Sequence, residues 1–274
     1  MIEQLRSKGA EWNVAIEETR ETPSSVLGFG VRDGRRVVLK ISKGLNDEAR
    51  SGEVLKAFGG DAAVRVYEYE PGAVLLERLE PGEELVSLVR RGDDDEATPI
   101  LADVIAKLAG HNAPAGTVTV ADWSRAFDWY VQTGDQQIPA ALVHEAHNTY
   151  CNLAASQRRT MLLHGDLQHY NVLYDDERGW VVIDPKGVVG ELEYEVGALM
   201  RNPIELPELF TQRATVERRL GMLARLLPLD LSRALRWCFA QAVLSVIWGV
   251  EDGYKIESNH PALLLADVLK SMID

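Results

Sequence analysis

The chain has 274 residues, 46% of them hydrophobic, and 42 acidic against 29 basic residues give it a formal net charge of −13. This length and composition allow a substantial core and suit one two-lobed domain or two small domains. Nucleic-acid binding needs clustered Lys and Arg, so the acidic balance argues against a nucleic-acid partner. The N-terminus lacks the apolar core of a signal peptide, and no apolar run approaches the roughly 18 residues of a membrane span, so we expect a cytoplasmic protein without membrane contact.

The first hundred residues are predicted to form short strands and one helix. Four apolar or β-branched runs are the expected strands: 25–31, 36–41, 64–69 and 73–79. Asp33-Gly34 between the first two is a hairpin signal. Asn46 and Asp47 can cap a helix that runs to about Phe58 and ends at Gly59-Gly60. The order strand–strand–helix–strand–strand is typical of a nucleotide-binding kinase lobe.

The boundary between two lobes is predicted at Pro81-Gly82, a turn that follows the last of these strands. It divides the chain into a nucleotide-binding lobe, residues 1–80, and a second lobe, residues 81–274, that carries the catalytic loop and the substrate site. An acidic run at 93–96 is expected to be a solvated stretch before a helix that starts at Thr98-Pro99.

The second lobe is predicted to be mainly helical. Five segments have the spacing of helices with one buried face: 123–131, 139–155, 208–227, 231–250 and 261–272. A small hairpin, formed by residues 172–174 and 180–183, interrupts them. Together with the antiparallel strands of the first lobe, these helices predict an α+β fold with a small antiparallel-sheet N-lobe and a mainly helical C-lobe.

The polar loop at residues 164–171 carries the strongest functional signal. His164, Asp166 and Asn171 have the spacing of a kinase catalytic loop, and the next apolar run ends in Asp184. Phosphoryl transfer needs a group that deprotonates the attacking hydroxyl and oxygen ligands that hold Mg²⁺. Asp166 is therefore the candidate catalytic base, and Asn171 and Asp184 are the candidate magnesium ligands. The alternative, a buried His164 with Asp166 and Asp184 as turn and strand-end residues, explains the joint pattern less well.

Three positions in the first lobe are candidates for binding the phosphates of ATP. Lys40 ends an apolar strand and can reach the α- and β-phosphates, although a strand-terminal lysine also commonly extends to water. Ser24 and Ser25 can bond the β- and γ-phosphates, and they are equally plausible as plain turn residues. Lys40 needs a helix carboxylate as its partner. We choose Glu48, on the flank of the buried helix face, over Glu53 on the opposite face.

The strand at residues 74–79 is the expected hinge of the nucleotide site. Adenine recognition needs one backbone carbonyl acceptor, expected near Glu77, and one backbone amide donor, expected near Leu79. Side-chain identity carries little information at such positions, because backbone groups make the contacts.

Five stretches of this sequence resemble the aminoglycoside phosphotransferase family, in particular its branch of streptomycin and hydroxyurea phosphotransferases: residues 75–82, 95–98, 164–171, 183–191 and 199–203. Asp184-Pro185, in place of Asp-Phe-Gly, is the most specific mark of this likeness. The resemblance implies a protein-kinase-like fold, with Asp166 as the base, Asn171 and Asp184 on magnesium and Lys40 on ATP. It also implies a phosphate ester and ADP as products.

Carboxylates that follow Asp184 predict a small cationic or amino-substituted acceptor. Glu191, Glu193 and Glu195 come soon after this residue, and an ammonium or guanidinium group would gain charge-assisted hydrogen bonds among them. We assign Glu191 to the substrate site, whereas Glu195 is expected to anchor the catalytic loop from the next helix. A streptomycin-type aminoglycoside is the first expectation, and an aminosugar or hydroxyurea is the alternative.

Two other classes of protein were weighed. A catalytically silent nucleotide-binding pseudokinase would not need Lys40, Asp166, Asn171 and Asp184 together. A kinase of protein side chains would carry an Ala-Pro-Glu activation segment, and the sequence has none. Both classes are therefore less consistent with the sequence than a small-molecule kinase.

Overall fold

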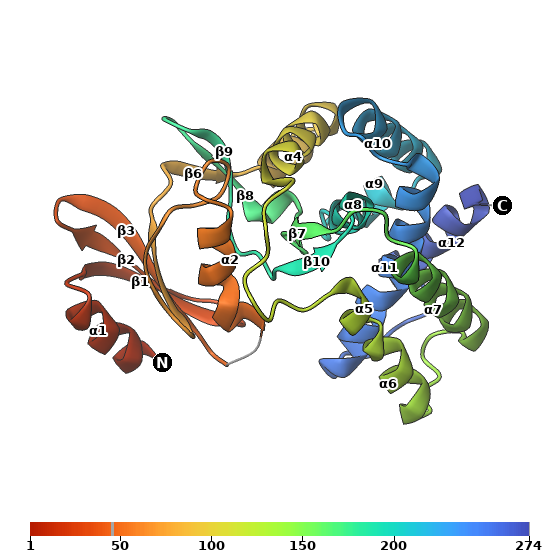
Figure 1. Ribbon diagram of the computed structural model, residues 1–274, viewed down its shortest axis with the longest axis horizontal. Helices are drawn as coiled ribbons and strands as arrows, with labels where there is room; N and C mark the ends of the chain where they lie inside the picture. Colours follow the sequence, from red (N-terminus) through yellow and green to blue (C-terminus); the bar gives the residue numbers. More distant parts are fainter. Residues whose placement is uncertain (45–46, 274) are drawn as a thin grey trace.

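The computed structural model describes residues 1–44 and 47–273. Its N-terminal part is built on a five-stranded antiparallel sheet in the order β1-β2-β3-β5-β4 (Figure 1). The strands are Ala15–Glu21 (β1), Ser25–Arg32 (β2), Arg35–Ser42 (β3), Val66–Glu70 (β4) and Ala73–Glu77 (β5). A helix, Ser51–Ala57 (α2), follows the short 3-10 turn Asp47–Arg50 (η1). The four predicted strands and the predicted helix are confirmed, with boundaries that differ by a few residues.

The hairpin between β2 and β3 forms at the predicted Asp33-Gly34. Arg32 pairs directly with Arg35, and the two residues between them both have positive φ, 50° for Asp33 and 74° for Gly34. Such a two-residue turn matches the twist of the flanking strands. At its other end, β3 places Lys40 between its neighbours in β2 and β5, opposite Leu27 and Val74.

Two N-terminal elements were missed by the sequence analysis: helix Ile2–Glu11 (α1) and strand β1. Leu5 of α1 is fully buried against the sheet, where a Cβ at Gly28 would lie 3.2 Å from its methyl group. A Cβ at Gly30 would lie 2.2 Å from the carbonyl oxygen of Ala15, so only glycine allows β1 to approach β2 this closely. The prediction of a single helix in this lobe was therefore wrong.

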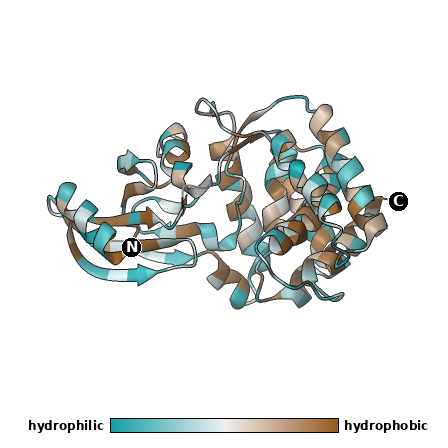
Figure 2. Ribbon diagram, turned by 90° about the horizontal axis from the view of Figure 1, so that it is seen from below, coloured by the Kyte–Doolittle hydropathy of each residue, from teal (hydrophilic) through white to brown (hydrophobic). Residues whose placement is uncertain are grey.

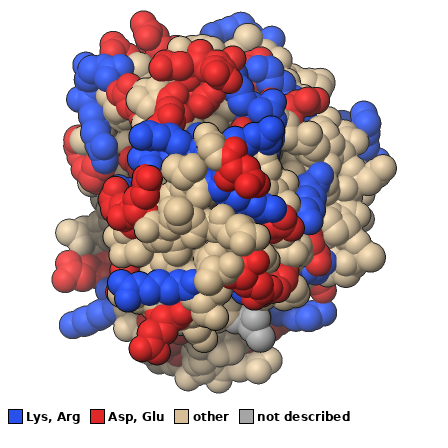
Figure 3. All heavy atoms as spheres, turned by 90° about the vertical axis from the view of Figure 1, so that its left-hand side faces the viewer, with Lys and Arg blue, Asp and Glu red and all other residues tan. Residues whose placement is uncertain are grey.

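The face at the sheet end of the molecule has no single sign of charge. Figure 3 shows Lys and Arg side chains interspersed with Asp and Glu over this face. Ion pairs in the N-terminal part include Lys8 with Glu11 at 2.7 Å and Arg32 with Glu68 at 2.8 Å. The carboxylates of these two pairs are exposed, whereas the Lys8 and Arg32 side chains are 17% and 26% exposed.

A second, three-stranded sheet connects the N-terminal sheet to the helices, and the boundary predicted at residues 80 and 81 falls between β5 and its first strand. Its strands, in the order β6-β8-β9, are Pro81–Glu84 (β6), Val172–Asp175 (β8) and Gly179–Val182 (β9). The predicted hairpin is thus present as β8 and β9. The loop after α2 also joins β9, because Val64 N donates to Val182 O at 2.9 Å and Val182 N donates to Ala62 O at 2.8 Å.

The rest of the chain is mainly helical, as predicted. Its helices are Val86–Arg90 (α3), Asp94–Leu108 (α4), Val120–Trp123 (α5), Arg125–Thr133 (α6), Ala140–Ala155 (α7), Leu192–Met200 (α8), Pro207–Phe210 (α9), Arg213–Leu226 (α10), Leu231–Glu251 (α11) and Pro261–Ile273 (α12). Helix α11 packs against α7, α8 and α12 and contributes many buried apolar residues to the core. Figure 2 shows hydrophobic residues gathered among the helices of this part. None of the helices in the described ranges combines the length and apolarity needed to cross a bilayer.

The prediction for the acidic run at residues 93–96 was right for Asp95 and Glu96, which are exposed, and wrong for Asp94 and for the start of the helix. Helix α4 begins at Asp94, four residues before Thr98, and contains Pro99. Asp94 is 4% exposed rather than solvated, because Arg219 of α10 donates to its carboxylate at 2.6 Å. The partner lies 125 residues further along the chain, and so the local sequence carried no sign of it.

Arg178 is the main side-chain link between the two sheets. It lies between β8 and β9, is 11% exposed, and contacts the Glu77 carboxylate and the carbonyl oxygens of Gly60 and Ala63. Replacing Arg178 with Met would leave Glu77 buried without its main charge partner. We expect Arg178→Met to lower the free energy of unfolding by about 3 kcal/mol, measured by urea denaturation. Arg159→Met, at an exposed position, is the control, and an equal effect of both variants would contradict this role.

Candidate active site

The catalytic loop of residues 164–171 joins strand Met161–Leu163 (β7) to β8, and His164 ties it to the segment that carries Asp184. The His164 ring is fully buried, and its Nε2 lies 2.8 Å from the carbonyl oxygen of Ile183. The His164 carbonyl accepts hydrogen bonds from the amides of Lys186 and Gly187, each at 3.0 Å. Burial lowers the pKa of the ring. His164 is therefore a neutral connector between the two functional segments.

Glu195, in α8, anchors the same loop from below, as the sequence analysis expected. Its Oε2 accepts from the His164 amide at 2.7 Å and its Oε1 accepts from the Gly165 amide at 3.0 Å. The carboxyl group is 4% exposed. Burial raises its pKa to about 7, although the two amide donors favour the ionised form. These bonds fix the backbone immediately before Asp166.

Asp166 and Asn171 are held at opposite ends of one short turn. Asn171 Nδ2 donates to the carbonyl oxygen of Asp166 at 2.8 Å, which leaves the amide oxygen of Asn171 as a possible ligand. The side chain of Gln168 caps the turn by accepting from Tyr170 N at 2.8 Å. The Asp166 carboxylate is 30% exposed, and Arg201 Nη2 lies 3.8 Å from its Oδ1. A base of this kind can receive a proton from a bound hydroxyl group.

Asp184 brings the two lobes together. Its carboxylate contacts Lys40 Nζ, which comes from β3 and belongs to a side chain only 5% exposed. Asp184 has φ 58°, a left-handed conformation that is uncommon for a residue other than glycine and often marks a functional position. The predicted pairing of Lys40 with Glu48 falls on a side chain outside the described part of the chain. Glu53, the alternative, bonds Arg50 at 2.8 Å instead.

The groups at Asn171 and Asp184 fit a magnesium ion. The Ile183 amide donates to the Asn171 carbonyl at 2.9 Å, so the two candidate ligands are tied through the backbone. Magnesium usually takes one or two protein oxygens and completes its shell with phosphates and water. No group of three or more His, Cys, Asp or Glu among the described residues forms a cation site. A dedicated protein cage is unnecessary for a metal that arrives with a nucleotide.

The turn at Ser24 and Ser25 connects β1 to β2. The Ser25 amide donates to Thr22 Oγ1 at 3.0 Å, and the two hydroxyl groups lie 2.8 Å apart, so the buried Ser25 side chain is engaged within the turn. The Lys43 amide donates to Ser24 O at 2.8 Å. The hydroxyl of Ser24 has no hydrogen-bond partner among the described residues. Of the two serines, only Ser25 therefore has its side chain bonded within the described turn.

The hinge expectation concerned Glu77 and Leu79. The Glu77 carboxylate accepts from Arg65 N at 2.8 Å and contacts Arg178, so its side chain serves the fold. No described residue accepts a hydrogen bond from the amide of Leu79. The amide of Glu80, its neighbour, is bonded to Asp175 Oδ2 at 3.0 Å. The Leu79 amide is thus left without a backbone partner in the described part of the chain.

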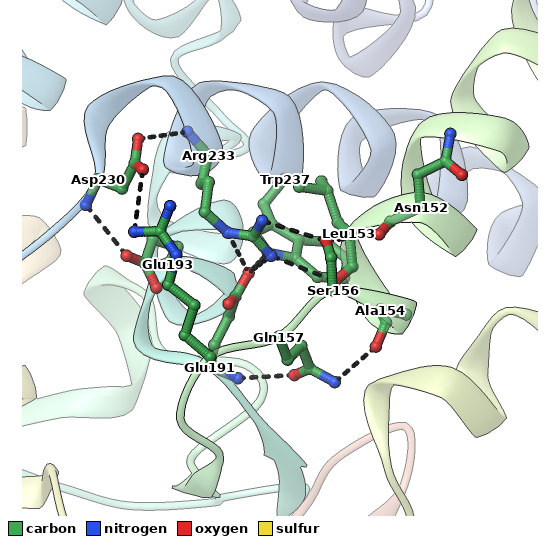
Figure 4. Close-up of polar contacts among 11 residues, drawn as sticks. Asn152, Leu153, Ala154, Ser156, Gln157, Glu191, Glu193, Asp230, Arg233 and Trp237 are labelled. Atoms are coloured by element: carbon green, nitrogen blue, oxygen red, sulfur yellow. Dashed lines mark hydrogen bonds and ion pairs between the residues drawn. The ribbon is translucent and has the colours of Figure 1, made fainter.

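The placement of Glu191 does not fit the predicted substrate contact. Its side chain is 3% exposed and accepts hydrogen bonds from Trp237 Nε1 at 2.6 Å and Arg233 Nε at 2.9 Å (Figure 4). Glu193 is likewise occupied, because its Oε1 accepts from the amide of Asp230 at 3.0 Å. Glu191 and Glu193, like Glu195, therefore bond to the protein itself. Their partners are distant in sequence, which is why the spacing from Asp184 misled the prediction.

The structure adds neighbours of Asp166 to which the sequence analysis gave no role. Trp123 packs against the loop, since a Cβ at Gly165 would lie 3.0 Å from its ring. Trp123 also meets Trp248 edge to face at a centroid distance of 5.5 Å, and Lys186 Nζ lies 5.1 Å from the Trp248 ring centre. Both tryptophans lie in segments with helical spacing, so the position of Trp123 beside the catalytic loop had no local signal.

Glu195 makes the stability of the protein depend on pH. Between pH about 4.5 and about 7, the folded state keeps a proton that the unfolded state has released, so stability falls as pH rises through this window. The side-chain amide of the Glu195→Gln variant does not ionise in this pH range. We expect the unfolding free energy of the wild type, relative to Glu195→Gln, to fall by on the order of 3 kcal/mol across the window, because one pKa unit corresponds to about 1.4 kcal/mol. Urea unfolding at several pH values measures this, and a difference independent of pH would contradict it.

Two solved structures that match this fold are described as small-molecule kinases. A thermostable mutant of the aminoglycoside phosphotransferase APH(4)-Ia, in a ternary complex with AMP-PNP and hygromycin B, matches with a TM-score of 0.66 at 18% identity, over 98% of this chain and 97% of that one. The choline kinase LicA from Streptococcus pneumoniae matches with a TM-score of 0.66 at 15% identity, over 99% and 98%. The predicted protein-kinase-like, two-lobed α+β fold is confirmed.

Sequence comparisons give the family. A family model described as "Aminoglycoside/hydroxyurea antibiotic resistance kinase" matches residues 12–253. Streptomycin 3''-kinase of Klebsiella pneumoniae is 31% identical over 247 residues, which cover 88% of this chain and 91% of that protein. Hydroxyurea phosphotransferase of Kitasatospora aureofaciens is 30% identical over 229 residues, which cover 81% and 64%. The chain therefore belongs to the aminoglycoside/hydroxyurea antibiotic resistance kinase family, a family of small-molecule phosphotransferases.

Proposed function

We propose that this protein transfers the γ-phosphoryl group of ATP to a hydroxyl group of a small amino-substituted molecule. The observation that carries the proposal is the contact between Lys40 and Asp184 beside the loop of Asp166 and Asn171. It brings a cation for phosphates, oxygen ligands for a metal and a partly exposed carboxylate to one place. Phosphoryl transfer needs these three kinds of group.

In the proposed reaction, Lys40 binds the α- and β-phosphates, and Asn171 and Asp184 hold magnesium. The metal, when bound, neutralises the triphosphate charge that develops during transfer. Asp166 orients the acceptor hydroxyl and takes its proton as the oxygen attacks the γ-phosphorus. The bond from that phosphorus to the β-phosphate oxygen breaks, which yields ADP and a phosphate ester. The backbone near Glu77 and Leu79 would meet adenine, with Ser24 near the terminal phosphates.

A streptomycin-type aminoglycoside is the proposed acceptor. Streptomycin 3''-kinase and two streptomycin 6-kinases are among the relatives, which supports this class over other hydroxyl compounds. Hydroxyurea is the second candidate, since a hydroxyurea phosphotransferase is 30% identical. Glu191 and Glu193 no longer support a cationic acceptor. The carboxylates proposed to contact a cationic acceptor are instead the exposed Glu251 and Asp252 at the end of α11.

A screen for ADP release tests the proposed function. Purified protein is assayed with magnesium and ATP against streptomycin, other aminoglycosides, simple aminosugars and hydroxyurea. We expect streptomycin to give the highest kcat/KM. ADP release no faster with any acceptor than with water would contradict the proposal.

Asp166→Ala tests the assignment of the catalytic base. We expect turnover to fall by about two to four decades, the usual contribution of a positioned acid or base, while ATP affinity changes little. Steady-state assays and calorimetry measure the two quantities. Asp103→Ala, at an exposed position on α4, is the control. Asp166 would lose this assignment if the variant kept more than about a tenth of the turnover.

Asp184→Asn tests the metal site. The change removes the charge of a candidate ligand and of the Lys40 partner, so we expect magnesium-dependent ATP binding and activity to be lost together. Calorimetric titration with ATP, with and without magnesium, measures the effect. Asp176→Asn, in an exposed turn, should bind like the parent. Equal binding of magnesium-ATP by Asp184→Asn and the parent would make Asp184 a structural residue.

A further inference from the structure

A buried ion pair joins α4 to α10 and has no part in the proposed chemistry. Asp94 is 4% exposed and Arg219 is 1% exposed. Arg219 Nη2 donates to Asp94 Oδ1 at 2.6 Å and its Nε donates to Oδ2 at 3.1 Å, while Arg218 also contacts this carboxylate. Burial opposes ionisation of Asp94, but the bonds from the two arginines outweigh it and lower its pKa. The pair is therefore charged.

Stability alone is a poor explanation for this pair. Removing two charges from water is costly, and well-packed apolar side chains often replace buried ion pairs without loss of stability. The pair also orients the third guanidinium nitrogen of Arg219, Nη1, toward the backbone near the end of α8. Arg219 Nη1 donates to the carbonyl oxygens of Leu199, at 3.1 Å, and Asn202, at 2.8 Å. Leu199 lies in the last turn of α8 and Asn202 lies two residues beyond its end, where helix carbonyl groups lack regular intrahelical partners.

The two carbonyl groups stand on either side of Arg201 in the chain. Arg219 thereby fixes the backbone from which the Arg201 side chain reaches Asp166, where its Nη2 lies 3.8 Å from Oδ1. Arg201 Nη1 is buried and has no hydrogen-bond partner among the described residues. A buried donor without a partner destabilises the fold, so hydrogen bonding does not account for the presence of Arg201 at this buried position. Its ion-pair partner is the candidate base.

We propose that Asp94 and Arg219 are positioning residues for the catalytic base and act through Arg201. The pair fixes the end of α8, and Arg201 then holds the Asp166 carboxylate in the orientation that receives the acceptor proton. This inference rests on the proposed role of Asp166. It assigns a function to the one carboxylate of the acidic run that the fold buries.

The test combines Arg219→Lys and Arg201→Gln. Lysine keeps the charge opposite Asp94 but lacks the planar fork that reaches both the carboxylate and the carbonyl groups. With the acceptor found in the screen, we expect each variant to lower kcat by about tenfold to a hundredfold, the range expected of a small misplacement, with little change in the KM for ATP. Because both act through one contact, the double variant should be no slower than the slower single variant.

Arg233→Lys is the matched control. Arg233 also pairs with a buried carboxylate, Glu191, and also donates to a helix carbonyl, that of Leu153 at 3.2 Å. It has no contact with the catalytic loop in the described structure. We expect Arg233→Lys and Arg219→Lys to lower the melting temperature alike, and only Arg219→Lys to lower kcat. If Arg219→Lys does not fold, Asp94→Asn, which keeps one acceptor for Arg219, takes its place.

A crystal structure of Arg219→Lys gives a readout that does not depend on activity. We expect the segment 199–202 to shift and the distance from Arg201 Nη2 to Asp166 Oδ1 to exceed the 3.8 Å found here. An unchanged distance, or effects of the single variants that multiply in the double variant, would overturn the inference. Loss of turnover in Asp166→Ala with normal kcat in Arg201→Gln and Arg219→Lys would overturn it and leave the proposed function standing.

Discussion

The two amide groups of His164 and Gly165 donate to one buried carboxylate, Glu195, and the rest of the site depends on this bond pair. A catalytic loop that leaves a strand has backbone groups that need partners away from water. Glu195 supplies acceptors for the amides, and the His164 carbonyl meets the amides that follow Asp184. The backbone bonds at His164 and Gly165 thus fix the position of the candidate base, Asp166, relative to the candidate metal ligand, Asp184.

The N-terminal sheet is joined to the candidate site by a different set of contacts. Strand β9 joins the loop after α2 by backbone hydrogen bonds, and Arg178 crosses to Glu77 and the Ala63 carbonyl. With the two sheets linked in this way, β3 delivers Lys40 to the Asp184 carboxylate. A phosphate chain placed between them would meet charges whose separation is set by packed elements rather than by loops.

Local sequence was sufficient where the structure depends on short-range chemistry. The loop of residues 164–171, the Asp33-Gly34 hairpin and the longer helices α7, α10, α11 and α12 carry signals within one turn or a few residues, whereas the short helix α3 was not predicted. The prediction failed where a distant partner decides the outcome. Nothing near Asp94 or Glu191 reveals Arg219 or Arg233, and acidic residues without visible partners were taken to be solvated or to face a substrate. Tertiary contacts, not propensity, determined those positions.

Strand β1 was overlooked because all but one of its residues are exposed and four of them are charged: Glu17, Glu18, Arg20 and Glu21. The same composition has a use at this location, since β1 is an edge of the five-stranded sheet. An open edge presents unpaired backbone groups to other molecules, and it invites strand pairing between copies of the chain. Charged side chains and the irregular register between Ile16 and Glu18 oppose such pairing. The charged residues that kept β1 from being predicted as a strand thus also oppose aggregation through this edge.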